Sequence, residues 1–84
     1  MAIKTVLAPL PGTFYQKPVE DHPNFKSEAD KVALGDAIGL IEVMKSFTSV
    51  NATDAGTFVR YLIDNEDAVM AGDAICEIDT GDKE

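Results

Sequence analysis

An internal repeat is the feature that most limits what this chain of 84 residues can fold into. The segment VLAPLPGTF, residues 6–14, shares Val, Ala, Gly, Thr and Phe with VNATDAGTF, residues 50–58. The segment ADKVALGDAIGLIE, residues 29–42, likewise matches EDAVMAGDAICEID, residues 66–79. The displacements are 44 residues (50 − 6) and 37 residues (66 − 29), so the first half carries 7 more residues (44 − 37) than the second. The repeat predicts a fold made of two similar halves.

The repeat also decides the type of secondary structure. Taken alone, GTFVRYLIDNEDAVMAG fits an amphipathic helix, with Ala55, Phe58 and Leu62 near one helical face. The equivalent part of the first half contains Pro9 and Pro11, and each would cost a helix interior about 3 kcal/mol. Both copies are therefore predicted to be strands. The runs KTVLA, GTFY, AIGLIE, FTSVNA, GTFVRYLI and AICEI support this, being rich in β-branched and aromatic residues. We expect an all-β sandwich or flattened barrel of two quasi-symmetric sheets.

Turns and core follow from the same pattern. Gly35-Asp36 and Gly72-Asp73 stand at equivalent places and are predicted to be tight turns. Met44 is expected to fill space beneath a hairpin, and Cys76 to be a buried, inert thiol. The residues expected to pack in the core are Phe14, Val32, Ile38, Phe47, Phe58, Tyr61, Val69 and Ile75.

Composition and charge exclude several classes of function. The length allows one domain, residues 1–84, with one small core. A net charge of −8 argues against nucleic acid and anionic membranes as partners, because phosphate binding needs concentrated Lys and Arg. No apolar run approaches the roughly 20 residues that span a bilayer, so a cytoplasmic location is expected. The single His22 has no Cys or His at ligand spacing, so no metal site is predicted.

Lys45 lies between the two halves. The first half ends near Glu42 and the second begins near Val50, so the chain must reverse through VMKS, residues 43–46. A hairpin turn places its central side chains in solvent, on a rigid base. Such a lysine is ordinarily a solvated surface residue, but its place at the symmetry point makes Lys45 the first candidate for function.

The stretch EVMKSF, residues 42–47, resembles the attachment motif of biotin carboxyl carrier domains, which usually reads Glu-Ala-Met-Lys-Met. The resemblance extends from VLAPLPGTFY to AGDAICEID, nearly the whole chain. It implies a barrel-sandwich hybrid of two four-stranded antiparallel sheets, with biotin attached covalently to Lys45. Glu42, Val43, Met44 and Ser46 would then form the motif that a biotin protein ligase recognises. Val43 replaces the usual Ala, and Ser46 replaces the usual Met or Leu.

The additional residues of the first half also carry a resemblance. The segment QKPVEDHPNFKSEAD, between Tyr15 and Lys31, is similar to the thumb of carriers of the acetyl-CoA carboxylase type, and we place the thumb at about 16–28. In that family the thumb leans toward the biotin ring, which implies that Lys17 and Pro18 lie near the cofactor. Lys17 stands where relatives have small hydroxyl residues, so a specific thumb-to-biotin hydrogen bond does not carry over. We expect deletion of roughly residues 17–27 to leave the fold intact.

The resemblance implies a carrier and not an enzyme. A biotin carboxylase would use ATP and bicarbonate to carboxylate a ureido nitrogen of biotin, and a carboxyltransferase would pass the carboxyl group to an acceptor such as an acyl-CoA. The domain would carry carboxybiotin between them. Two alternatives are a lipoyl carrier of a 2-oxoacid dehydrogenase complex and an unmodified interaction module. Met44 and the thumb count against lipoate, because lipoyl domains typically have Asp before the lysine and lack the thumb.

Overall fold

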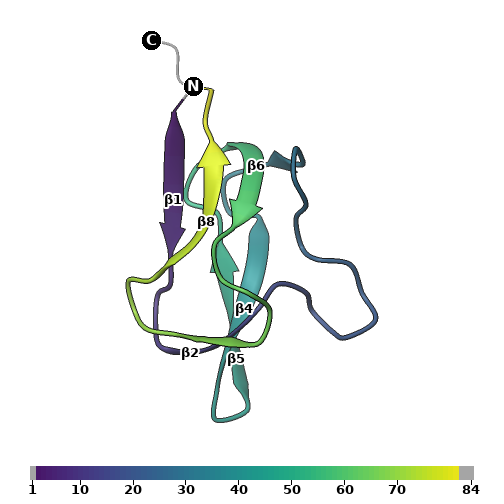
Figure 1. Cartoon of the computed structure of the whole chain (residues 1–84), viewed down its shortest axis with the longest axis vertical. Helices are drawn as coiled ribbons and strands as arrows, with labels where there is room; N and C mark the ends of the chain where they lie inside the picture. Colours follow the sequence, from purple (N-terminus) through teal and green to yellow (C-terminus); the bar gives the residue numbers. More distant parts are fainter. Residues whose placement is uncertain (1, 82–84) are drawn as a thin grey trace.

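The computed structural model describes residues 2–81, which form eight strands and no helix (Figure 1). In chain order the strands are β1 (Ile3–Leu7), β2 (Gly12–Tyr15), β3 (Lys31–Val32), β4 (Ala37–Val43), β5 (Ser46–Asn51), β6 (Gly56–Tyr61), β7 (Asp67–Val69) and β8 (Ala74–Asp79). They build two antiparallel four-stranded sheets, which we call the β1 sheet (order β1-β8-β6-β3) and the β5 sheet (order β5-β4-β2-β7). The predicted all-β, two-sheet architecture is confirmed. Within the described residues, no helix is long and apolar enough to cross a membrane.

The two sheets repeat one another strand by strand. The repeat makes β1 equivalent to β5, β8 to β4, β6 to β2 and β3 to β7, and this substitution converts the order of one sheet into the order of the other. Each sheet therefore contains two strands from each half of the chain. Because neither half can build a sheet by itself, the halves must fold together around a shared core.

Both predicted glycine turns are confirmed, and their hydrogen bonds are equivalent in the two halves. The Gly35 N–H donates to the Ala52 carbonyl at 2.9 Å, and the equivalent Gly72 N–H donates to the Ala8 carbonyl at 2.9 Å. Gly35 and Gly72 have φ angles of +89° and +90°, a conformation in which a side chain would be strained. Each turn belongs to one half and is bonded to the other, so the turns hold the two halves together.

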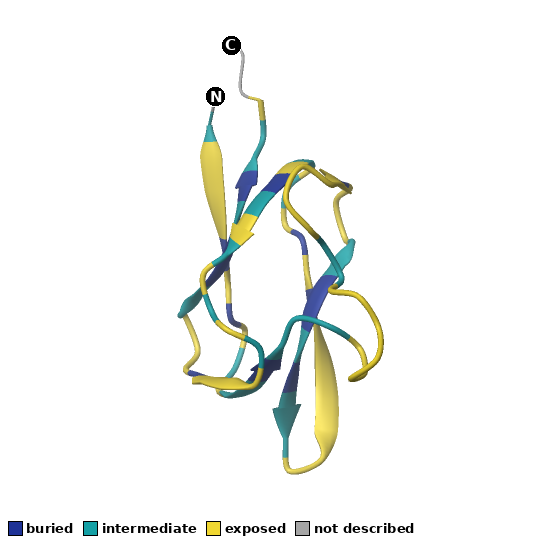
Figure 2. Cartoon of the chain, turned by 45° about the vertical axis from the view of Figure 1, so that its right-hand side comes forward, coloured by how far each residue is buried: buried dark blue, intermediate teal, exposed yellow. Residues whose placement is uncertain are grey.

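The core lies between the two sheets (Figure 2). Its buried residues are Val6, Ala8, Phe14, Val32, Ile38, Ile41, Val50, Ala52, Phe58, Val69, Ile75, Cys76 and Ile78. The predicted core positions Phe14, Val32, Ile38, Phe58, Val69 and Ile75 are all among them. Burial raises the pKa of the Cys76 thiol to about 12, which keeps it protonated and unreactive, as predicted.

Phe47 and Met44 are more exposed than predicted, whereas Tyr61 packs against the core as predicted. Phe47 is 57% exposed, because it lies three residues before the buried Val50 on β5 and so points from the opposite face of the sheet. Met44 is 93% exposed, so the prediction that it fills space beneath the hairpin is wrong. Tyr61 is half-buried and packs against the core, while its hydroxyl donates to the Ile38 carbonyl at 2.7 Å.

The hairpin lies at the opposite end of the molecule from the start of β1 and the end of β8 (Figure 1). There, the Thr80 N–H donates to the Ala2 carbonyl at 2.8 Å, which continues the pairing of β1 with β8. At the other end, β4 and β5 project beyond the rest of the fold. At one end of the molecule a turn therefore joins β4 to β5, whereas at the other end the equivalent strands β8 and β1 are paired without a turn between them.

Candidate functional site

The connection between β4 and β5 consists of Met44 and Lys45 alone. Val43 and Ser46 are the last residues paired across the two strands. Met44 has a φ of 51° and Lys45 a φ of 70°. Positive φ at both central residues is typical of the type I′ hairpin turn, which usually contains Asn and Gly. Residues with a Cβ pay on the order of 1 kcal/mol or more each for this conformation. The hairpin was predicted, and the turn is a strained one.

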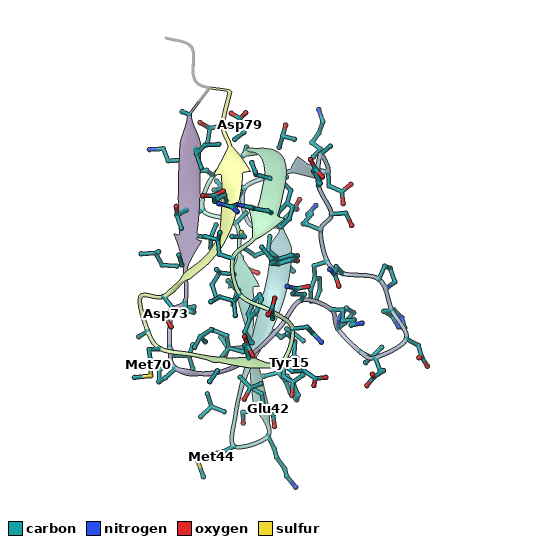
Figure 3. All side chains as sticks on the ribbon, in the orientation of Figure 1. Tyr15, Glu42, Met44, Met70, Asp73 and Asp79 are labelled. Carbon is teal, nitrogen blue, oxygen red and sulfur yellow. The ribbon has the colours of Figure 1, made fainter. Side chains whose placement is uncertain are left out.

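Lys45 is exposed and follows Met44, which Figure 3 shows at the tip of the hairpin. The ion pairs of the described residues are Lys26 with Asp36 and Arg60 with Glu77, so Lys45 takes part in neither. It also takes part in none of the side-chain hydrogen bonds of residues 2–81. Among residues 2–81, no side chain that could remove its proton is hydrogen-bonded to it. A partner that supplies a base would let this amine react as a nucleophile.

A brace from β2 supports the base of the hairpin. The Tyr15 hydroxyl donates to Glu42 Oε1 at 2.9 Å, and both residues lie close to the hairpin in Figure 3. Phe47 is paired directly with Glu42 across β4 and β5, and its ring centroid lies 6.0 Å from that of Tyr15. The hydrogen bond to Glu42, together with partial desolvation, raises the pKa of Tyr15. Glu42 was predicted as part of a recognition motif, and the structure adds a contact with Tyr15 that the sequence pattern did not indicate.

Gly12 gives β4 room to pass close to β2. A Cβ on Gly12 would lie 2.5 Å from the Glu42 carbonyl oxygen and 2.9 Å from Val43 Cγ2. Val43 is half-buried and packs against the core, while Ser46 opposite it is exposed. Val43 therefore contributes to packing at the root of the hairpin, whereas Ser46 is available to a partner.

A pocket of about 130 Å³ lies beside the hairpin, and we call it the thumb pocket. Its lining residues are Tyr15, Lys17, Pro18, Val19, Glu20, Phe47, Asn65 and Glu66. Lys17 and Pro18, predicted from the sequence to lie near a cofactor, share this pocket with Phe47, two residues from Lys45. Asn65 and Glu66 were not predicted, because they belong to the loop between β6 and β7 and no motif marks them.

Gln16 explains why that second loop reaches the pocket. Its N–H donates to Asn65 Oδ1 at 2.6 Å, and its side-chain Nε2 donates to the Ile63 carbonyl at 2.7 Å. Its carbonyl accepts a hydrogen bond of 2.8 Å from the Phe25 N–H, and its Oε1 accepts one of 3.1 Å from Asn24. One residue thus joins the beginning of the thumb to the loop of the other half.

The far end of the thumb is held by Lys26. Its ammonium donates to the Lys31 carbonyl at 2.9 Å and pairs with Asp36 Oδ2 at 3.0 Å. Lys26 Nζ and the Ala33 N–H hold the pKa of Asp36 below its usual value, the Ala33 hydrogen bond being the larger cause. Only residues 17–24 therefore project between two anchored ends, as the loop beside β4 in Figure 1 shows. This narrows the deletion expected to leave the fold intact, because removal of residues 17–27 would also remove Lys26.

Comparison with known proteins identifies relatives for most of the chain. A family model described as "Biotin-requiring enzyme" matches residues 4–80. The biotin carboxyl carrier protein of acetyl-CoA carboxylase from Porphyra purpurea is 30% identical over 76 residues, which are 90% of this chain and 48% of that protein. The protein of the same description from Chlamydia pneumoniae is 34% identical over 73 residues, which are 87% of this chain and 44% of that protein. The chain spans about half the length of these curated relatives.

Solved structures show the same likeness in three dimensions. The crystal structure of urea carboxylase from Kluyveromyces lactis matches 93% of this chain, at a TM-score of 0.74 and 31% identity, and the match covers 6% of that enzyme. A single-chain, multi-domain long-chain acyl-CoA carboxylase matches 89% of this chain, at a TM-score of 0.70 and 27% identity, over 7% of its length. The fold described above is thus found as a small part of large carboxylases.

Proposed function

We propose, from the premise that this chain belongs to the family of biotin-requiring enzymes, that it is a biotin carboxyl carrier and that Lys45 bears the biotin. The observation that carries the proposal is the turn of Met44 and Lys45. Both residues hold an unfavourable φ where the common Asn-Gly pair would form the same turn with less strain. Strain of this kind persists where the surrounding structure imposes it, and it clusters at functional sites. Here the strained residue carries an exposed amine that has no partner among residues 2–81.

The residues beside the hairpin fit biotin. The walls of the thumb pocket include the rings of Tyr15 and Phe47 and the ring of Pro18, which suit an apolar bicyclic ring. Asn65 and Lys17 supply the polar groups that a ureido group needs. The bound cofactor would supply a nitrogen that accepts and releases a carboxyl group. The chain itself would supply attachment, orientation and shelter.

Attachment needs an exposed lysine and an external base. A lysine is mostly an ammonium ion at neutral pH, so the ligase must take the proton before the amine attacks biotinyl-adenylate. The new amide bond then forms while AMP leaves. Met44, 93% exposed, and Ser46, exposed at the start of β5, present side chains that a ligase can contact. Glu42 and Val43, held by Tyr15 and the core, would fix the angle of the hairpin.

After attachment the domain would act by tethering. A flexible arm on a rigid hairpin raises the effective concentration of the cofactor at each partner site, without tight contact between the proteins. The partners would be a biotin carboxylase and a carboxyltransferase of the acetyl-CoA carboxylase type, since the relatives are carrier proteins of that enzyme. We place this non-catalytic carrier in the cytoplasm. Lipoate as the attached group is disfavoured, because Met44 precedes the lysine and the relatives named above are biotin carriers.

Modification of Lys45 tests the proposal directly. The chain is coexpressed with the biotin protein ligase of its own organism and examined by intact mass and streptavidin blot. Wild type should gain one biotin and Lys45→Arg none. Lys17→Arg serves as the matched control, since it changes another lysine near the hairpin and should leave the modification in place. A wild-type chain that gains no biotin contradicts the proposal, and a lipoyl adduct would replace it with the lipoyl alternative.

A further inference from the structure

We propose that Lys17 makes the thumb pocket selective for the carboxylated form of the cofactor, by pairing its ammonium with the carboxylate that the ureido ring acquires. The proposal rests on the function proposed above, because it requires biotin on Lys45. It adds a charge-selective contact within that site and assigns it to one residue.

The first observation is that Lys17 is a half-buried cation that has no partner within residues 2–81. It lines the thumb pocket and is neither fully exposed nor fully buried. Neither ion pair of the described residues includes it, and it makes none of their side-chain hydrogen bonds. Lys26, at the other end of the thumb, is bonded to both a carbonyl and a carboxylate. Removing a charge from water without a partner costs free energy, so the pocket gains when an anion enters beside Lys17.

The second observation is how charge is distributed over the pocket. Glu20 and Glu66 are the carboxylates of its lining, and both residues are exposed. Lys17 and Asn65, which line the same pocket, are half-buried. Charges at an exposed rim are screened by water and salt, whereas a partly buried charge is screened less. An anion beside Lys17 would therefore meet a less screened positive charge than the negative charges of the two exposed carboxylates.

The third observation is that Lys17 and Asn65 offer hydrogen-bond donors to a ligand in the pocket. Asn65 Oδ1 already accepts the Gln16 N–H, which leaves the Asn65 amide nitrogen for a ligand. Lys17 has donors only, whereas the Tyr15 hydroxyl has already given its hydrogen to Glu42 and is not a donor for a ligand. A pocket that offers N–H groups is complementary to a ligand that presents acceptor oxygens.

The two forms of the cofactor differ in this respect. An uncarboxylated ureido ring presents one acceptor oxygen and two N–H donors, which face donors unfavourably. Carboxylation replaces one N–H by a carboxylate, so that one donor is lost and two charged acceptors appear. Phe47 lines the pocket only two residues from Lys45, a distance of about 7 Å along a strand, which an extended lysyl arm can fold back to cover. The loaded ring should therefore dock, and the unloaded ring should be released.

Docking would protect the carboxyl group. It is lost when the bond between nitrogen and carbon breaks, the electron pair stays on the ureido nitrogen, carbon dioxide leaves and water supplies a proton. An ammonium beside the carboxylate stabilises the charge where it lies before the bond breaks. Lys17 thus slows spontaneous loss while the carrier travels between partners.

The experiment uses the biotinylated chain. A biotin carboxylase loads it from ATP and labelled bicarbonate, the carboxylase is removed, and release of the label is followed in the isolated carrier. In parallel, NMR records the shifts of the Lys17 backbone amide and the Asn65 side-chain amide before and after loading. Lys17→Gln is compared with Lys17→Arg, which keeps the charge, and with Lys4→Gln, an exposed lysine on β1 of the other sheet.

We expect Lys17→Gln to release the label about two to five times faster than wild type, the size expected of a partly exposed ion pair. Lys17→Arg should stay near wild type, Lys4→Gln should equal it, and added salt should speed release from wild type. The Asn65 side-chain amide should shift on loading. Equal release from wild type and Lys17→Gln, or an Asn65 amide that does not move, overturns the proposal. A chain that never takes up biotin fails at the earlier step and refutes the carrier function instead.

Discussion

The strand pair β4–β5 and its equivalent pair β8–β1 have the same place in their sheets but different ends. The first pair is closed by Met44 and Lys45 in a strained turn. The second pair stays open, with Thr80 bonded to Ala2 where the described chain ends. A second difference lies in the loops, since residues 16–30 separate β2 from β3 whereas residues 62–66 separate β6 from β7. The candidate site thus consists of segments in which the two halves differ, whereas the strands and their order in the sheets are equivalent in both halves.

The largest stability effect should come from the two equivalent glycines, Gly12 and Gly56. A Cβ on Gly12 would lie 2.5 Å from the Glu42 carbonyl oxygen, and one on Gly56 would lie 2.3 Å from the Asp79 carbonyl oxygen. We expect Gly12→Ala and Gly56→Ala each to lower the free energy of unfolding by about 1–3 kcal/mol, because backbone must shift in both. Urea denaturation measures this.

The same pair separates fold from function. Only Gly12→Ala displaces the strand that carries the hairpin, so only this variant should also slow biotinylation by the ligase. If both variants, assayed well below their denaturation midpoints, lose biotinylation to the same degree, the hairpin has no special dependence on β2. The hairpin of β4 and β5 would then differ from the equivalent pair β8 and β1 in its sequence but not in how its function depends on the neighbouring strand.

The next effect concerns the thumb, the loop that only the first half carries. Deletion of residues 17–24, with a short Gly linker, should change the free energy of unfolding by less than about 1 kcal/mol, because this part lies between the anchors at Gln16 and Lys26. Deletion of residues 17–27 should cost more, since it removes the Lys26 contacts with Lys31 and Asp36. Thermal unfolding of the two variants decides this. Equal stability would show that Lys26 does not anchor the thumb.

The smallest effect should come from the turn itself. Met44→Gly relieves a φ of 51° and should raise the free energy of unfolding by up to about 1 kcal/mol. It also removes an exposed side chain from the proposed ligase motif, so we expect slower biotinylation of a more stable protein. Ligase kinetics and denaturation on the same sample test both parts. A variant that is less stable would show that the turn is not strained at Met44.

The repeat made much of this fold predictable. The prolines of the first copy predicted the element type, and the equivalent glycines and apolar positions predicted the turns and most of the core, because strands alternate two faces and glycine tolerates a positive φ. The same alternation does not say which face of an edge strand is covered. Phe47 was therefore placed in the core, although it stands on the outer face of β5 beside Tyr15. Met44 was misplaced for a related reason, since nothing lies beneath a two-residue turn beyond the last strand pair.

By itself, the sequence determined the two-half architecture, the reversal of the chain at Lys45 and the additional residues of the first half, since each rests on spacing and residue type along the chain. Only the tertiary structure decided that Gln16 brings Asn65 and Glu66 to the thumb, that Tyr15 braces Glu42 and that Lys17 lies half-buried with no partner in the described part of the chain. Asn65 is 49 residues from Gln16. Contacts over such separations depend on how two sheets twist and pack, which local pattern does not encode.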